Sequence, residues 1–235
     1  MSGHLTTVQK KQQLLSLARK RQSFLTSPDA RLLSGKYNNI AHYDRPELQF
    51  ECDHVSPYTK CASNVDSKIM VVLQDWQEHR FFQDPKHEQD RHYAATLGRA
   101  PALKANKNLD RLVETHFHLS VADIYVTNLF PFIKFCDIPT QDYRLAAKVF
   151  CLPQIEIVAP DLVICAGLEV FNALRHLGGA RQLQNLDEAV GRSSPCKLHD
   201  HHLWCQAHPS ARGKWDASNV GPHWNRMAKW YESRV

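Results

Sequence analysis

The chain has 235 residues, 43% of them hydrophobic, and a formal net charge of +5. Its length fits one α/β domain, or one domain with an N-terminal extension, and its hydrophobic content is sufficient for a packed core. No apolar run approaches the roughly 20 residues that a membrane-spanning helix needs, so we expect no membrane partner.

The N-terminus and the cysteine count bear on the compartment. Residues 1–21 are polar and lack the apolar core of a secretory signal, which predicts a cytoplasmic protein. In that compartment the seven cysteines are expected to be reduced thiols. The modest positive charge, to which 14 histidines add below neutral pH, suits a polyanionic partner without identifying one.

The first 60 residues differ in pattern from the rest of the chain. Residues 5–26 read as a helix with an apolar side that includes Leu14, Leu17 and Leu25. Residues 27–67 are polar, contain three prolines and predict irregular structure. We therefore expect residues 1–60 to form an N-terminal helix and irregular extension, packed on a domain of residues 61–235.

The remaining chain alternates between apolar runs and helical periodicity. Four apolar runs predict strands at residues 68–73, 123–128, 161–165 and 203–207. Helical spacing predicts helices at residues 86–97, 106–118, 141–158, 168–177 and 219–232, with a kink near Pro153. Alternation of this kind indicates an α/β fold, a three-layer α/β/α sandwich with a central four-stranded parallel sheet.

Polar side chains follow three of the predicted strands. Asp75, Asn128 and His208 stand at or just beyond the carboxyl ends, where ligands bind in open α/β sheets. A carboxylate can orient a water or stabilise a cation, and a neutral imidazole can donate to a developing oxyanion. A side-chain amide suits the edge of a nucleobase. Together these groups are the parts needed to cut an N-glycosidic bond to a base.

The sequence resembles the uracil-DNA glycosylase superfamily over roughly residues 68–212. Four stretches, in the order and strand context of that family, carry the resemblance: residues 71–75 (VVLQD), 125–128 (YVTN), 154–167 (QIEIVAPDLVICAG) and 208–210 (HPS). Residues 208–212 (HPSAR) are most similar to the single-strand-selective branch. The motif around Gln74 and Asp75 is similar to the classical branch, and the region of Cys151 to the iron–sulfur branch.

The resemblance implies a role for each motif residue. Asp75 would orient the attacking water and His208 would face the base O2, which makes these two the catalytic residues. Substrate binding would involve Gln74, Trp76 and Asn128, with Asn128 reading the base edge. Ser210 would touch a DNA phosphate, and Arg212 would enter the base stack as a wedge.

The implied activity is that of a monofunctional DNA glycosylase. The enzyme would flip uracil or a related deaminated base out of single- or double-stranded DNA, a step known for glycosylases, and hydrolyse its N-glycosidic bond. An abasic site would remain, and we expect a monomer. No residue stands out from the sequence as a covalent amine nucleophile. The aromatic side chain that stacks on the base is not obvious, with Phe81, Phe82 and Tyr93 as candidates.

Two alternatives stay open at this point. Leu73 and Trp76 stand where the family has small residues or proline, and Gln77 follows where one branch has tyrosine; these departures favour a non-catalytic nucleic-acid-binding or regulatory protein of the same fold. The other alternative is a Cys-His hydrolase that uses Cys205 or Cys165 with His208.

A cofactor is not required by this interpretation. An iron–sulfur cluster is nevertheless an alternative, because one branch of the family holds a cluster on four cysteines. Cys151 matches its last ligand position, and Cys52, Cys61 and Cys136 are the candidates for the others. Their spacings are wider than those of typical cluster ligands.

Overall fold

A five-stranded, mostly parallel sheet forms the centre of the protein. The computed structural model describes residues 5–234. The strand order is β3-β2-β5-β7-β6, and the four parallel strands correspond to the four predicted ones. Their bounds are Ile69–Asp75 (β2), Tyr125–Phe130 (β3), Leu162–Ala166 (β5) and His201–Gln206 (β7). The predicted sheet gains one strand, β6 (Cys196–Leu198), which pairs antiparallel with β7 at the edge.

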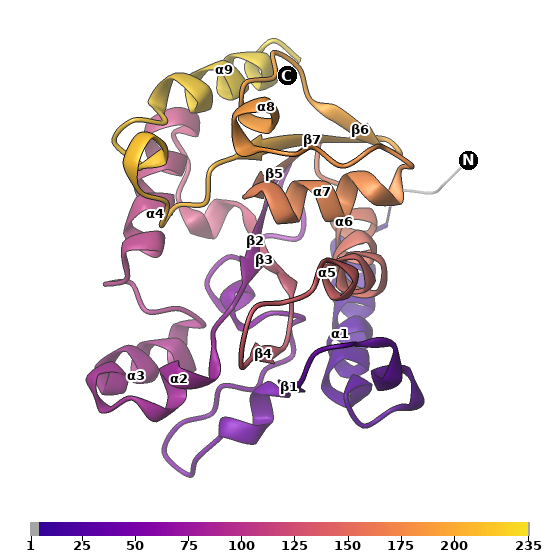
Figure 1. Ribbon diagram of the computed structural model, residues 1–235, viewed down its shortest axis with the longest axis vertical. Helices are drawn as coiled ribbons and strands as arrows, with labels where there is room; N and C mark the ends of the chain where they lie inside the picture. The colour runs from indigo at the N-terminus through magenta and orange to yellow at the C-terminus, as the bar shows by residue number, and fades with distance from the viewer. Residues whose placement is uncertain (1–4, 235) are drawn as a thin grey trace.

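Helices cover both faces of the sheet and confirm the α/β/α layering (Figure 1). Alternate side chains of β2 point to opposite cores, Met70 and Val72 to one and Val71 to the other. The first core is closed by α1 (Thr7–Phe24), α5 (Thr140–Ala146), α6 (Leu152–Val158), α7 (Leu168–Leu177) and the short α8 (Leu186–Val190). The second core is closed by α2 (His79–Gln83), α3 (Glu88–Leu97), α4 (Lys104–Phe117) and α9 (Gly221–Glu232).

The predicted helix at residues 141–158 is interrupted where the sequence contains Pro153. A π-helical turn at residues 147–151 joins α5 to α6, and Pro153 occupies the first turn of α6. Proline has no N–H to donate to the preceding turn, so the irregularity falls just before it. The kink expected from the sequence is thus realised as a π turn.

The segment predicted to be irregular contains several short ordered elements. Three 3₁₀ turns lie at residues 28–32, 40–43 and 57–60. The two-residue strand β1 (Tyr37–Asn38) pairs antiparallel with β4 (Ile133–Lys134), a pairing the sequence analysis missed. This pairing joins the N-terminal segment to the chain that follows β3.

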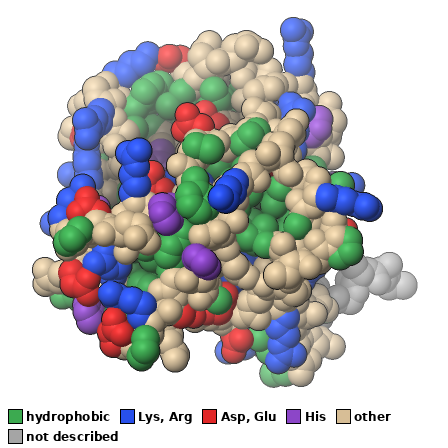
Figure 2. Space-filling view, turned by 60° about the horizontal axis from the view of Figure 1, so that its bottom comes forward, with side chains coloured by type: hydrophobic (Ala, Val, Ile, Leu, Met, Phe, Trp, Pro, Cys, Tyr) green, Lys and Arg blue, Asp and Glu red, His purple; other side chains and the backbone are tan. Residues whose placement is uncertain are grey.

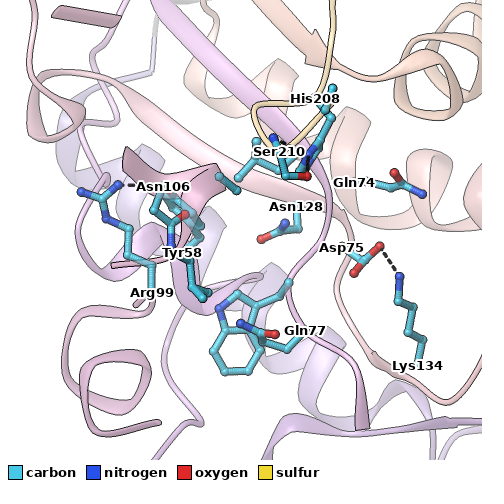
Figure 3. A pocket seen from close by; sticks show the side chains of 15 residues that line it. Tyr58, Gln74, Asp75, Gln77, Arg99, Asn106, Asn128, Lys134, His208 and Ser210 are labelled. Carbon is cyan, nitrogen blue, oxygen red and sulfur yellow. Dashed lines mark hydrogen bonds and ion pairs between the residues drawn. The ribbon is translucent and has the colours of Figure 1, made fainter. Parts of the chain in front are cut away.

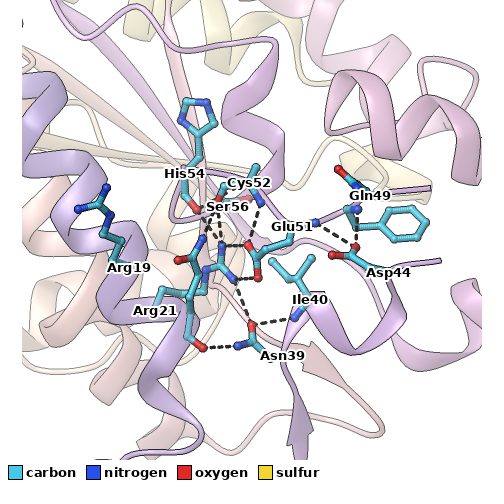
Figure 4. A network of polar contacts seen from close by, with 12 residues as sticks. Arg19, Arg21, Asn39, Ile40, Asp44, Gln49, Glu51, Cys52, His54 and Ser56 are labelled. Atoms are coloured by element: carbon cyan, nitrogen blue, oxygen red, sulfur yellow. Dashed lines mark hydrogen bonds and ion pairs between the residues drawn. The ribbon is translucent and has the colours of Figure 1, made fainter. Parts of the chain in front are cut away.

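A buried arginine ties α1 to the N-terminal segment (Figure 4). Arg21 is fully buried, and its terminal nitrogens contact the Glu51 carboxylate and donate to Asn39 Oδ1 at 3.1 Å and to the carbonyl of His54 at 3.0 Å. Burial raises the pKa of Glu51, but the Arg21 contact and the Cys52 N–H outweigh it and hold the pKa below its usual range. The network therefore fixes residues 51–54 against α1.

Between residues 5 and 234, no helix combines the length and the apolar character that a bilayer span requires.

Candidate functional site

One pocket lies at the carboxyl ends of the parallel strands (Figure 3). Its volume of about 440 Å³ falls in the range of small-molecule sites, roughly 300–1,000 Å³. Apolar side chains and the first turn of α4 form part of the wall. Polar and charged residues form the rest: Tyr58, Gln74, Asp75, Gln77, Arg99, Asn106, Asn128, Lys134, His208 and Ser210.

The strand order explains why distant residues meet here. The chain passes from β2 to β3 on one side and then crosses to β5 and β7 on the other, and ligands bind at such switch points. β5 lies between β2 and β7, and it ends in Ala166 followed by Gly167. Neither residue has a side chain beyond Cβ. The imidazole of His208, which follows β7, therefore lines the same pocket as Asp75 at the end of β2.

Asn128 presents a hydrogen-bond donor to the pocket. The residue is only 1% exposed, and its Oδ1 accepts from the Ser56 hydroxyl at 2.5 Å. Ser56 Oγ also accepts from the Tyr58 N–H, which leaves its own proton for Asn128. Asn128 Nδ2 is buried and has no partner within residues 5–234. Because buried polar groups are normally paired, an unpaired amide in a pocket wall suits a ligand that carries an acceptor.

His208 presents a donor of its own. The Ser210 N–H donates to His208 Nδ1 at 3.2 Å, so Nδ1 is an acceptor and the proton of the neutral ring resides on Nε2. Burial lowers the pKa of His208 below its usual range; Asp75 opposes that shift and Lys134 reinforces it. The ring is therefore neutral at pH 7, with an N–H available to an oxyanion.

Asp75 is paired with a lysine that the sequence analysis missed. Lys134 Nζ donates to Asp75 Oδ2 at 2.9 Å, and Figure 3 shows the two side chains directed toward each other at one side of the pocket. Their side chains are 15% exposed for Asp75 and 22% for Lys134. Lys134 lies in β4, outside every motif considered above, and no local pattern marks it.

The two neighbours of Asp75 are held by bonds that lead away from the pocket. Gln74 Nε2 donates to the Tyr143 hydroxyl at 2.5 Å. Trp76 is 8% exposed, and its Nε1 donates to the Gly98 carbonyl at 2.7 Å. The Trp76 ring is thus a fixed wall, and the cavity remains open beside it.

The sequence analysis also missed two residues of the pocket wall, Tyr58 and Arg99. Tyr58 is buried, and its hydroxyl accepts from Arg99 Nη1 at 3.0 Å, while Arg99 is paired with Asp110 at 2.5 Å. Phe81, Phe82 and Tyr93, the aromatic candidates from the sequence, lie outside the lining, and Tyr58 and Trp76 take that place. Phe81 and Phe82 instead pack with each other in the second core. Tyr58 and Arg99 lie in segments without helical or strand periodicity, so no sequence pattern indicates that they line a site.

The loop after β7 contributes only in part. Ser210 lines the pocket, and the Pro209 carbonyl accepts from Asn108 Nδ2 at 2.7 Å, which anchors the loop to α4. Arg212 is exposed two residues further on, outside the lining. Its role as a wedge stays a prediction.

The cysteines do not fit an iron–sulfur cluster in this structure. Within the described residues, no three His, Cys, Asp or Glu side chains come together as metal ligands. Cys151 is fully buried, where burial raises its pKa, whereas Cys136 is exposed. Cluster ligands must be thiolates at one place, and these four cysteines do not meet that condition. Burial also raises the pKa of Cys165 and Cys205, which makes them poor nucleophiles.

The comparisons with known proteins give no family. No protein-family model matches the chain, and a search of curated proteins finds no match.

Proposed function

We propose that the protein is a DNA glycosylase that releases uracil or a related deaminated base. One observation carries the proposal: the unpaired Asn128 amide, the neutral His208 ring and the Asp75 carboxylate line a single pocket. These groups are a reader of base edges, a stabiliser of the departing base and a stabiliser of the sugar. The resemblance of the motifs to uracil-DNA glycosylases agrees with this assignment.

Two hydrogen-bond donors of the pocket would recognise the base. Asn128 Nδ2 donates to a carbonyl oxygen on the edge of the flipped base, and this contact satisfies a group that is otherwise buried and unpaired. His208 Nε2–H donates to a second carbonyl oxygen, where negative charge grows as the base leaves. Together the contacts favour bases with two carbonyl oxygens, such as uracil and xanthine, whereas hypoxanthine, with one, can satisfy only one of them.

The sugar would be attacked by water. As the C1′–N bond breaks, its electron pair leaves with the base, and the sugar gains positive charge that the Asp75 carboxylate stabilises. Asp75 also orients a water whose oxygen bonds to C1′ and whose proton passes to the solvent or to the base. Hydrolysis then leaves an abasic site and the free base.

The surface is compatible with a polyanion. Figure 2 shows Lys and Arg side chains spread over the face that it presents, interspersed with acidic side chains, and hydrophobic side chains gathered in the middle. The net charge of +5 would attract the phosphate backbone, and base flipping costs least at a mismatched or single-stranded base. Ser210 and Arg212 lie on one loop and would contact the strand beside the flipped nucleotide.

A second candidate is a protein that binds a flipped base without cleaving it. The Lys134 contact favours this candidate, because it engages the carboxylate on which hydrolysis depends. A Cys-His hydrolase has no such support, since Cys165 and Cys205 are buried and lie outside the pocket lining.

A panel of oligonucleotides separates the two candidates. Each carries uracil, hypoxanthine or xanthine, single- or double-stranded, and released base is measured by chromatography. We expect the unaltered protein to release the base. His208→Ala should lower the rate of release by roughly 10²–10³-fold, the usual effect of losing one donor to an oxyanion. Binding of the modified strands without release identifies the binding protein, and neither binding nor release excludes both candidates.

A further inference from the structure

Lys134 places an amine beside the carboxylate that would face the reacting sugar. Its Nζ lies 2.9 Å from Asp75 Oδ2, and both side chains line the pocket. The pairing of β4 with β1 fixes the Lys134 backbone, with Tyr37 opposite Lys134. A ligand atom held against Asp75 is therefore also within reach of the Lys134 amine.

We propose that Lys134 is an amine nucleophile that forms an imine with C1′ of an abasic sugar, which gives the pocket a lyase activity on abasic DNA. The inference rests on the proposed function, because base release at Asp75 produces that sugar. Its open-chain form carries an aldehyde at C1′. Lysine amines that condense with carbonyl groups are established nucleophiles in enzymes once they lose a proton.

The pair of side chains supplies both proton transfers. The Lys134 ammonium gives a proton to the Asp75 carboxylate, and its lone pair attacks C1′. As the C–N bond forms, the π electrons of the C=O bond move to the C1′ oxygen, which takes this proton from Asp75. Asp75 then relays a second proton from the attached nitrogen to the same oxygen, which departs as water and leaves a protonated C=N bond. Asp75 then removes a proton from C2′; the electrons of that C–H bond form a C=C bond, and the C3′–O bond breaks with its electron pair on the phosphate. Water finally hydrolyses the imine and restores the Lys134 ammonium, and Asp75 releases the C2′ proton to the solvent.

Other lysines near the pocket lack this placement. Lys104 forms a similar pair, with Nζ 2.6 Å from Asp216 Oδ2, but neither residue lines the pocket. Lys60 is tethered to the Ala95 carbonyl at 2.7 Å and lies outside the pocket lining. Lys104 therefore offers a matched control: a paired lysine at the margin whose partner does not face the sugar.

The test uses the full chain and an oligonucleotide with a pre-formed abasic site, so that no base release is needed. Sodium borohydride reduces any imine to a stable amine, and the covalent adduct is seen on a denaturing gel. We expect an adduct with the unaltered protein and with Lys104→Arg, and none with Lys134→Arg, which keeps the charge but cannot form this imine. Peptide mapping of the adduct on the unaltered protein should place the DNA on Lys134.

The outcomes distinguish the two proposals. No adduct, an equal adduct with Lys134→Arg, or an adduct mapped to another lysine overturns the lyase inference, while base release from the panel would leave the glycosylase proposal standing. An adduct on Lys134 without base release from any panel member supports the amine and removes the glycosylase. Because the mapping uses the unaltered protein, the result does not depend on whether the variant folds.

Discussion

The protein contains two clusters of buried polar groups that differ in how fully they are paired. Around Arg21, both terminal guanidinium nitrogens are engaged by a carboxylate, an amide and backbone carbonyls, and of its three nitrogens only Nε has no partner among the described residues. In the pocket, Asn128 Nδ2 has no partner among the described residues, although the residue is almost as buried. A largely paired cluster stabilises the fold, whereas an unpaired donor on a residue that lines a cavity retains its capacity for a ligand.

The two clusters are joined through a short piece of chain. Arg21 binds the carbonyls of Cys52 and His54, and Ser56, two residues further along, donates to Asn128 Oδ1. The first cluster thus positions the residue that orients the amide of the second. The Arg21 network and the candidate site are therefore consecutive parts of one support.

The largest effect is expected at the pocket carboxylate. Asp75→Asn removes the charge that would stabilise the sugar and orient water, so uracil release should fall by roughly 10²–10⁴-fold. Single-turnover rates of base release measure the loss, and the urea midpoint checks the fold. A rate close to that of the unaltered protein would remove Asp75 from the mechanism.

Removing Arg21 from its network should lower the stability of the fold. Arg21→Met leaves Glu51 without its partner in a largely buried place, and breaking such a pair costs about 3–5 kcal/mol in the free energy of unfolding. Urea denaturation measures the change. Arg19→Met, an exposed position on the same helix, is the matched control and should stay within about 0.5 kcal/mol. Equal effects of the two changes would contradict the structural role of Arg21.

The unpaired group of Asn128 is a donor, its Nδ2. Asn128→Asp replaces that donor with an acceptor, so binding to a base carbonyl should weaken by about 1–3 kcal/mol and preference should shift toward bases with an amino group, such as cytosine. Release from uracil and cytosine oligonucleotides measures the ratio. Ser56→Ala, which removes only the orienting bond, should lower release without changing the preferred base.

The smallest effect is a pH dependence confined to the network. The pKa of Glu51 is lower in the folded chain than its usual value of 4.5, so Glu51 contributes stability above that pH and loses the contribution as pH falls through its folded pKa. Thermal unfolding between pH 7 and pH 3 should show a smaller decline for Glu51→Gln than for the unaltered protein. Parallel profiles would show that Glu51 is not coupled to folding.

The order of strands and helices could be predicted from the sequence because each element has a local pattern of apolar and polar residues. The runs that became β2, β3, β5 and β7 are apolar and bounded by polar residues, and the segments between them have helical spacing. Parallel strands bring their carboxyl ends to one edge, so the sequence alone predicts that Asp75, Asn128 and His208 lie together, and all three line the pocket. β6 escaped because it has three residues and joins the edge of the sheet.

The partners of those residues came only from the tertiary structure. Lys134 meets Asp75 across 59 residues of sequence, and Ser56 meets Asn128 across 72. Both partners lie in short, irregular segments without periodicity, so nothing local indicates where their side chains go. The sequence by itself determined the layers, the edge of the sheet and three polar residues there. The packing of segments far apart in the chain decided what each of them touches, because hydrogen bonds and ion pairs depend on distances that only the folded chain sets.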